Sequence, residues 1–144
     1  MIKYTFIAML FFLSGILASQ VLQRTSTEPY ILENEKDIPV KQTGPHNGGG
    51  ETTGFNFFSK AKDFHLAFRK RILHPGSAIG YHLQKEDEIY YVLSGRGEMQ
   101  MNGQSFEVKP GDAILTRPGS SHGLKQAGAE DLVIIINYIL KTEK

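Results

Sequence analysis

Cysteine is absent from this chain of 144 residues. Its absence excludes structural disulfides, thiolate metal ligands, a cysteine nucleophile and a lipid anchor on cysteine. Any metal site must therefore use nitrogen and oxygen ligands. The length leaves room for one domain and little more.

An excess of positive charge is also lacking, since 16 Lys and Arg residues stand against 15 Asp and Glu residues. Residues 1–20 hold a single charged residue, Lys3, so the remainder of the chain is formally neutral. Nucleic-acid binding needs clustered positive charge that displaces counterions from phosphates. We therefore predict that nucleic acid is not a partner.

The apolar run at residues 4–18 has the order of a secretory signal. It follows the basic residue Lys3 and ends at the small and polar residues Ala18, Ser19 and Gln20. A membrane-spanning helix needs about 20 apolar residues, and this run is shorter. We predict a signal peptide over residues 1–20, with its cleavage site left open, and a periplasmic or secreted protein. An uncleaved signal that anchors the chain in a membrane is the less favoured alternative.

Residues 21–56 are polar and show no sustained apolar periodicity. They include Pro29, Pro39, Pro45 and the run Gly48–Gly50, which are typical of turns and extended chain. We predict a polar linker or irregular N-terminal arm here, with one short strand near residues 38–40. An arm that crosses to a second subunit is an open alternative.

Residues 57–144 change to short apolar and β-branched runs separated by turns. The sequence Asn102-Gly103 between two such runs is a strong hairpin signal. Regularly spaced short strands of this kind are typical of an all-β sandwich or barrel. Strands are expected near residues 64–73, 78–84, 88–93, 98–101, 104–108, 113–116, 122–125 and 132–140.

Two strings of residues in this barrel carry candidate chemistry. The first runs from Gly76 to Gly95 and includes His82, Gln84 and Glu88; the second is a turn rich in Pro and Gly that ends at His122. His82 and Gln84 are two positions apart on one strand, so their side chains leave the same face. Glu88 follows a short turn onto the next strand, where it can reach the same face.

These strings resemble the two conserved motifs of the cupin superfamily, and the resemblance covers about residues 64–140. It implies a double-stranded β-helix, or jelly-roll, barrel in the manner of small single-domain cupins. Carried over by position, His82, Glu88 and His122 are the metal ligands, and Gln84 stands where the family has a further histidine. The resemblance also implies a homodimer.

The second motif departs from the family pattern at two further positions. Arg117 stands where proline is frequent and Gln126 where asparagine is frequent. We interpret both as tolerable changes in a loop and a strand. Only the departure at Gln84 touches the predicted metal site directly.

We predict that this ligand set binds one divalent metal ion. Two histidines and one carboxylate form the ligand set of non-haem iron sites with open positions, and Zn²⁺, Mn²⁺, Ni²⁺ or Fe²⁺ would each fit. The amide oxygen of Gln84 is neutral and harder than an imidazole nitrogen. We therefore expect Gln84 to be a weaker fourth ligand and the metal to exchange more readily than in a three-histidine site.

Three further residues are candidates for lining a substrate cavity. Tyr90 lies two positions after Glu88 and shares its face, although an aromatic residue there also suits the core. Arg69 and Arg71 share a strand face and suit an acidic substrate, although a solvated edge accounts for them equally well. The other histidines, at positions 46, 65 and 74, are interpreted as packing, surface or loop residues.

The favoured function is that of a metal-dependent enzyme acting on a small oxygen-rich metabolite. The metal would polarise substrate oxygens as a Lewis acid, and dioxygenase, isomerase or lyase chemistry would each be compatible with it. The alternative is a non-catalytic cupin that binds a small molecule or sugar. Fold analogy does not select between these classes.

Overall fold

The computed structural model describes residues 29–141. The predicted signal peptide at residues 1–20 lies outside the described residues. Within the described range, no helix is both long enough and apolar enough to cross a membrane.

The described chain folds almost entirely into β-strands. One short 3-10 helix, η1 (Glu35–Asp37), precedes them. The strands are β1 (Pro39–Thr43), β2 (Glu51–Phe57), β3 (Leu66–Leu73), β4 (Ala78–Leu83), β5 (Glu88–Ser94), β6 (Arg96–Met101), β7 (Gln104–Val108), β8 (Ala113–Thr116), β9 (Ser121–Ala127) and β10 (Leu132–Ile139).

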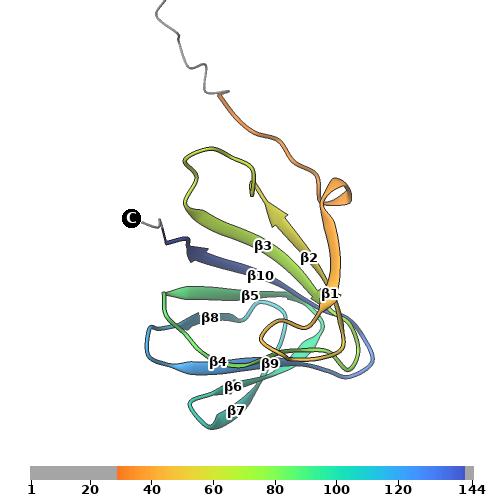
Figure 1. The fold of residues 1–144 in the computed structure, drawn as a ribbon. Coiled ribbons are helices and arrows are strands. Elements are labelled where there is room, and N and C mark those ends of the chain that lie inside the picture. The colour runs from red at the N-terminus through yellow and green to blue at the C-terminus, as the bar shows by residue number, and fades with distance from the viewer. Residues whose placement is uncertain (1–28, 142–144) are drawn as a thin grey trace, which may run out of the picture.

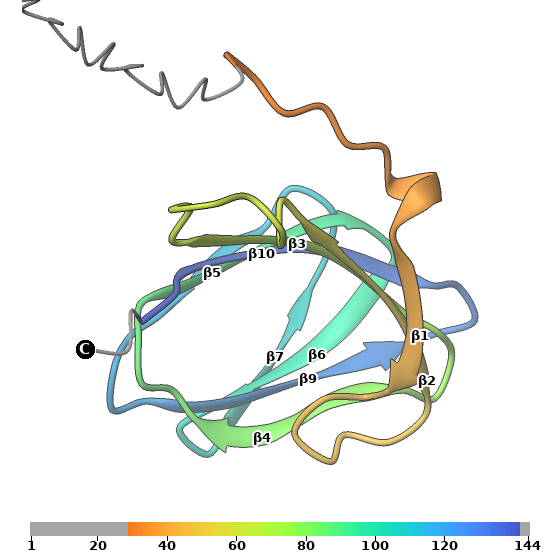
Figure 2. The ribbon, with the colours of Figure 1, turned by 45° about the horizontal axis from the view of Figure 1, so that its top comes forward.

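The strands form two antiparallel sheets that face each other (Figures 1 and 2). One sheet has the strand order β1-β2-β3-β10-β5-β8, and the other has the order β4-β9-β6-β7. Neighbours in the larger sheet, such as β3 and β10, are far apart in sequence, so the chain crosses repeatedly between the layers. The prediction of an all-β jelly roll is confirmed.

The core lies between the two layers and follows the alternation of the strands. In β5, Tyr90 and Val92 are buried while Ile89 and Tyr91 face outward, as a period of two requires. The central strand β10 buries residues from Leu132 to Ile136 in the same alternating manner. Opposing residues such as Met99 of β6 and Leu124 of β9 complete this cluster.

The larger sheet begins well before residue 57. Strands β1 and β2 lie within the segment that was predicted to be a linker or arm, and β2 pairs with β3 over Thr52 to Phe57. Strand β1 overlaps the short strand predicted near residues 38–40, whereas β2 was not predicted. Strand β2 contains buried polar residues. Thr52 is fully buried, and its hydroxyl donates to the carbonyl of Gln42 and accepts from Arg71. Such pairing leaves no apolar periodicity to detect.

Candidate metal centre

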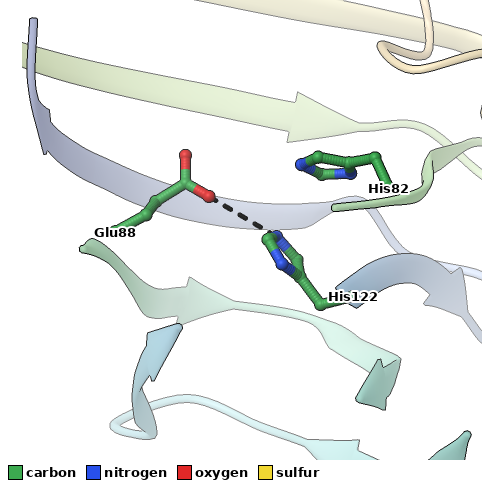
Figure 3. Close-up of side chains that lie close together, drawn as sticks. All are labelled: His82, Glu88 and His122. Atoms are coloured by element: carbon green, nitrogen blue, oxygen red, sulfur yellow. Dashed lines mark ion pairs between the residues drawn. The ribbon is translucent and has the colours of Figure 1, made fainter. Parts of the chain in front are cut away.

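Three side chains from three strands converge inside the barrel (Figure 3). His82 comes from β4, Glu88 from the start of β5 and His122 from β9. One potential ligand atom from each lies within 4.8 Å of the others. The structure thus brings together the three residues that the sequence motifs single out as metal ligands.

Strand register positions the two histidines. His82 and His122 are direct partners in the antiparallel β4–β9 pair, so their side chains leave the same face of the sheet. The register shifts between Ile79 and His82, which is the mark of a bulge or irregularity. Bulges commonly re-aim a side chain toward a site. The two imidazole centroids are 4.4 Å apart, with the rings inclined by 58°.

The tautomer of His82 follows from its backbone contact. Its Nδ1 atom lies 2.8 Å from the carbonyl oxygen of Gly80, which can only accept a hydrogen bond. Nδ1 must therefore carry the proton, and in the neutral ring Nε2 presents a lone pair. A hydrogen bond of this type is the usual means of orienting a metal-binding histidine.

Glu88 and His122 are both buried. The Oε2 atom of Glu88 is 3.4 Å from Nε2 of His122 and has no hydrogen-bond partner among the described residues. A buried carboxylate is costly unless it is paired or coordinates a metal. Two imidazoles and one carboxylate form a nitrogen and oxygen donor set that suits a borderline divalent cation. The residues present therefore fit a metal ion.

Tyr90 lies directly against this cluster. Its hydroxyl is 3.0 Å from Nε2 of His122, and its side chain is buried. Burial, and then the nearby Glu88 carboxylate, raises the pKa of Tyr90 well above its usual value, so the phenol stays neutral. Tyr90 therefore both belongs to the core and lines the cavity. If His122 coordinates a metal through Nε2, that atom must give up its hydrogen bond to the Tyr90 hydroxyl.

Gln84 is buried and lines the same cavity as His82 and Glu88. Backbone hydrogen bonds hold its position, because Gln84 N–H donates to the carbonyl of Ser120 and its own carbonyl accepts from Gly119. The cavity has a volume of about 290 Å³. Gln84 is therefore part of the wall of the cavity that His82 and Glu88 also line.

Two arginines, Arg69 and Arg71, are among the residues that line this cavity. Arg71 is only 5% exposed, so it does not lie on a solvated edge of the sheet. Its Nη1 atom donates to Thr52 Oγ1, and its guanidinium faces the side-chain amide of Gln42. The buried Nε atom of Arg71 has no acceptor among the described residues. Arg69 lies with its guanidinium carbon 5.0 Å from the ring centroid of Tyr138. Burial, and then Arg69, lowers the pKa of Arg71.

His46 is the residue that the sequence analysis missed. Its ring stacks on that of His82, with centroids 3.5 Å apart and planes within 5°, and it lines the cavity. It was interpreted as a packing or surface residue because a lone histidine in a strand is more often one of these than a metal ligand. The only local signal is the concentration of glycines around it, which permits a close approach of two backbones.

The other histidines lie outside the cluster. His74 follows β3 and bonds Thr53 and Asp131 with its two ring nitrogens, as a loop residue that secures neighbouring turns. His65 is exposed just before β3. Neither residue is among the lining residues of the cavity.

The two lesser departures from the motif have structural roles. Arg117 pairs with Asp87 at 2.8 Å on an exposed surface. Gln126 is buried and accepts from the backbone N–H of Gly76, while its amide nitrogen donates to the carbonyls of Gly128 and Glu130. Both residues therefore tie turns together outside the cavity.

Fold and site together define an all-β jelly-roll protein with a histidine and carboxylate cluster inside the barrel. Residues 70–138 match the family described as the cupin domain. Over 113 residues the chain is 32% identical to a protein of Thermotoga maritima named oxalate-binding protein, covering 76% of this chain and 93% of that one. The chain belongs to the cupin family.

Two further comparisons extend this relationship. The structure resembles a crystal structure from Thermotoga maritima described as a predicted oxalate decarboxylase, with a TM-score of 0.70 and 31% identity over 77% of this chain and 100% of that chain. A 5-nitrosalicylic acid 1,2-dioxygenase of a Bradyrhizobium species is 24% identical over 66 residues, which are 46% of this chain and 32% of that protein.

Proposed function

We propose that this cupin binds one divalent metal ion on His82, Glu88 and His122, and uses it to capture a small dicarboxylate such as oxalate. The observation that carries the proposal is the buried Arg71 guanidinium, because Arg71 lines the same cavity as His82 and Glu88 and its Nε has no acceptor among the described residues. The name of the relative from Thermotoga maritima, oxalate-binding protein, supports the choice of ligand.

The metal would supply Lewis acidity and a positive charge for one end of the ligand. Two histidines and one carboxylate leave open coordination positions that anionic oxygens can take. Gln84 would be the weaker fourth ligand. Zn²⁺, Mn²⁺, Fe²⁺ and Ni²⁺ all suit this donor set, so the ion is to be determined by elemental analysis.

Arg71 would supply the charge for the other end of the ligand. A guanidinium binds a carboxylate through charge-assisted hydrogen bonds, and burial strengthens them. Thr52 and Gln42 already hold the Arg71 head group in place, so little side-chain entropy is lost when a ligand binds. A cavity of about 290 Å³ has room for a small dicarboxylate.

Calorimetric titration of oxalate into metal-loaded protein tests this function. We expect saturable binding that disappears after the metal is removed, and weaker binding of acetate, which has one carboxylate. Arg71→Gln should weaken oxalate binding at least tenfold while the metal content stays unchanged. Arg96→Gln is the matched control, because Arg96 is exposed and pairs with Glu107 on the surface. Equal affinity for acetate and oxalate would contradict the proposal.

A metal-dependent enzyme is the second candidate. The observation in its favour is the ligand set of two histidines and one carboxylate, which also serves non-haem iron oxygenases. The partial similarity to a dioxygenase agrees with it. Oxygen uptake by the Fe²⁺-loaded protein with aromatic and dicarboxylate substrates tests the enzyme. Binding of dicarboxylates without any turnover would leave capture as the function.

We also propose that the protein is exported and forms a homodimer. Export is supported by the order of residues 1–20, and N-terminal sequencing of protein from the natural source tests it, since the mature chain should start near residue 20.

Outward-facing apolar residues on β5 and β8, among them Ile89, Tyr91 and Leu115, support a dimer. Sedimentation of the purified protein tests that proposal, and a monomer would refute it.

A further inference from the structure

The loop between β1 and β2, residues 44–50, lies along strand β4 (Figures 1 and 2). Two backbone hydrogen bonds hold it there: Gly80 N–H donates to the carbonyl of Pro45 at 2.9 Å, and Ala78 N–H donates to that of Gly49 at 3.2 Å. A Cβ at position 80 would meet the His46 carbonyl oxygen at 1.9 Å. Only glycine at position 80 allows the loop to approach so closely.

This loop stacks His46 against the ring of His82. The two rings are parallel within 5° and their centroids are 3.5 Å apart, which is close van der Waals stacking. His46 itself has a φ of 54°, a backbone conformation that non-glycine residues rarely adopt. The loop therefore holds an unfavourable backbone geometry at the residue that makes this contact.

Gly80 links the same loop to the other contact of the His82 ring. Its N–H donates to Pro45, and its carbonyl accepts from Nδ1 of His82 at 2.8 Å. The loop thus acts on His82 in two ways, by stacking on the ring and by anchoring the residue whose carbonyl selects the tautomer. Both contacts leave Nε2 facing the cluster with Glu88 and His122.

We propose that His46 is a positioning residue, which locks the His82 ring in the orientation and tautomer that the metal site requires. The importance of this role rests on the metal binding proposed above. His46 is not itself a ligand in this arrangement. The nitrogen lone pairs of an imidazole lie in its ring plane, and the rings of His46 and His82 are parallel within 5° with centroids 3.5 Å apart, so their lone pairs do not converge on one ion.

Nitrogen NMR of the metal-free protein tests the positioning role without relying on metal. At mildly alkaline pH, His82 in the wild type should show one tautomer with the proton on Nδ1. His46→Ala should give averaged ring-nitrogen shifts, because the ring can then rotate. His46→Phe should restore the wild-type pattern, since phenylalanine can stack but cannot coordinate. His65→Ala, which removes an exposed histidine, is the matched control.

Gly80→Ala displaces the same loop from the other side of the contact. Its new Cβ would strike the His46 carbonyl, so the His82 signal should change as in His46→Ala. Titration with Co²⁺ provides the second measurement. His46→Ala should weaken Co²⁺ binding by roughly 10- to 100-fold, as loss of an orienting contact does at other metal sites, and His46→Phe should recover most of it.

The outcomes separate this inference from the proposed function. An unchanged His82 tautomer in His46→Ala overturns the positioning role, whatever the metal affinity. Failure of His46→Phe to restore the pattern overturns stacking as its cause. A wild-type protein that binds no Co²⁺ but shows the tautomer change refutes the proposed metal function and supports the positioning role.

Discussion

Oε2 of Glu88 lies 3.4 Å from Nε2 of His122, and both side chains are almost entirely withdrawn from solvent. Neither side chain has an alternative ionic partner of the opposite sign among the residues described. A buried carboxylate that lacks a full set of hydrogen bonds costs free energy in the metal-free protein. A divalent cation between these atoms would relieve that cost.

Glu88→Gln should abolish stoichiometric metal binding. The amide keeps the shape of the side chain but removes the charge that the cation needs. The metal-free variant should be no less stable than metal-free wild type, because a buried charge is lost rather than gained. Elemental analysis and denaturant unfolding measure the two effects. Glu98→Gln, on the exposed face of β6, is the control, and equal metal content in both variants would speak against Glu88 as a ligand.

Gln84→His should make metal binding tighter. Replacing a neutral amide oxygen by an imidazole nitrogen gives a better ligand for borderline divalent metals. The variant should retain metal longer than wild type during dialysis against a chelator. Gln100→His adds a histidine on the exposed face of β6 and should leave retention unchanged. Equal or faster loss from the Gln84 variant would count against Gln84 as a ligand.

Tyr90→Phe should bind metal at least as tightly as wild type. The hydroxyl of Tyr90 occupies Nε2 of His122 in the metal-free protein, so its hydrogen bond must be broken on coordination. The metal-free variant should unfold about 1 kcal/mol more easily, the usual net value of one buried hydrogen bond. Calorimetry and urea unfolding check the two parts. A large fall in metal affinity would indicate that the hydroxyl itself supports coordination.

Gly95→Ala should destabilise the barrel far more than Gly103→Ala. Both glycines have positive φ, 79° and 81°, so each alanine carries a backbone penalty of about 1–2 kcal/mol. At position 95 the new Cβ would also meet the Asp131 carbonyl oxygen at 2.1 Å, whereas position 103 is open. Urea midpoints compare the two variants. Equal losses of stability would mean that the contact with Asp131 relaxes without cost.

The sequence was informative where alternation and motif spacing act together. The two-residue step from His82 to Gln84 and the short turn to Glu88 are local features, and the structure brings His82 and Glu88 together with His122. The prediction that Tyr90 lines the cavity rests on the same alternation, because Tyr90 lies two positions after Glu88. In the structure Tyr90 both belongs to the core and lines the cavity. Which side chains share a strand face depends only on the period of two of a β-strand, and this period can be read from the sequence.

In the N-terminal segment only the short strand near residues 38–40 was predicted, and strand β2 was not. Strand β2 pairs with β3, and its buried Thr52 accepts a hydrogen bond from Arg71, so the strand shows no apolar alternation. The stacking of His46 on His82 joins residues far apart in the chain. It depends on the fit of one loop against β4, which no spacing within a single strand encodes.

Metal content of the mature protein, purified from its natural compartment, tests the central claim most directly. Such a preparation avoids loading with the wrong ion during overexpression. The account predicts about one divalent ion per chain in wild type, lost on replacement of His82, Glu88 or His122. A correctly folded wild-type protein that contains no metal, and takes up none when Zn²⁺, Mn²⁺, Fe²⁺ or Ni²⁺ is added, would contradict it.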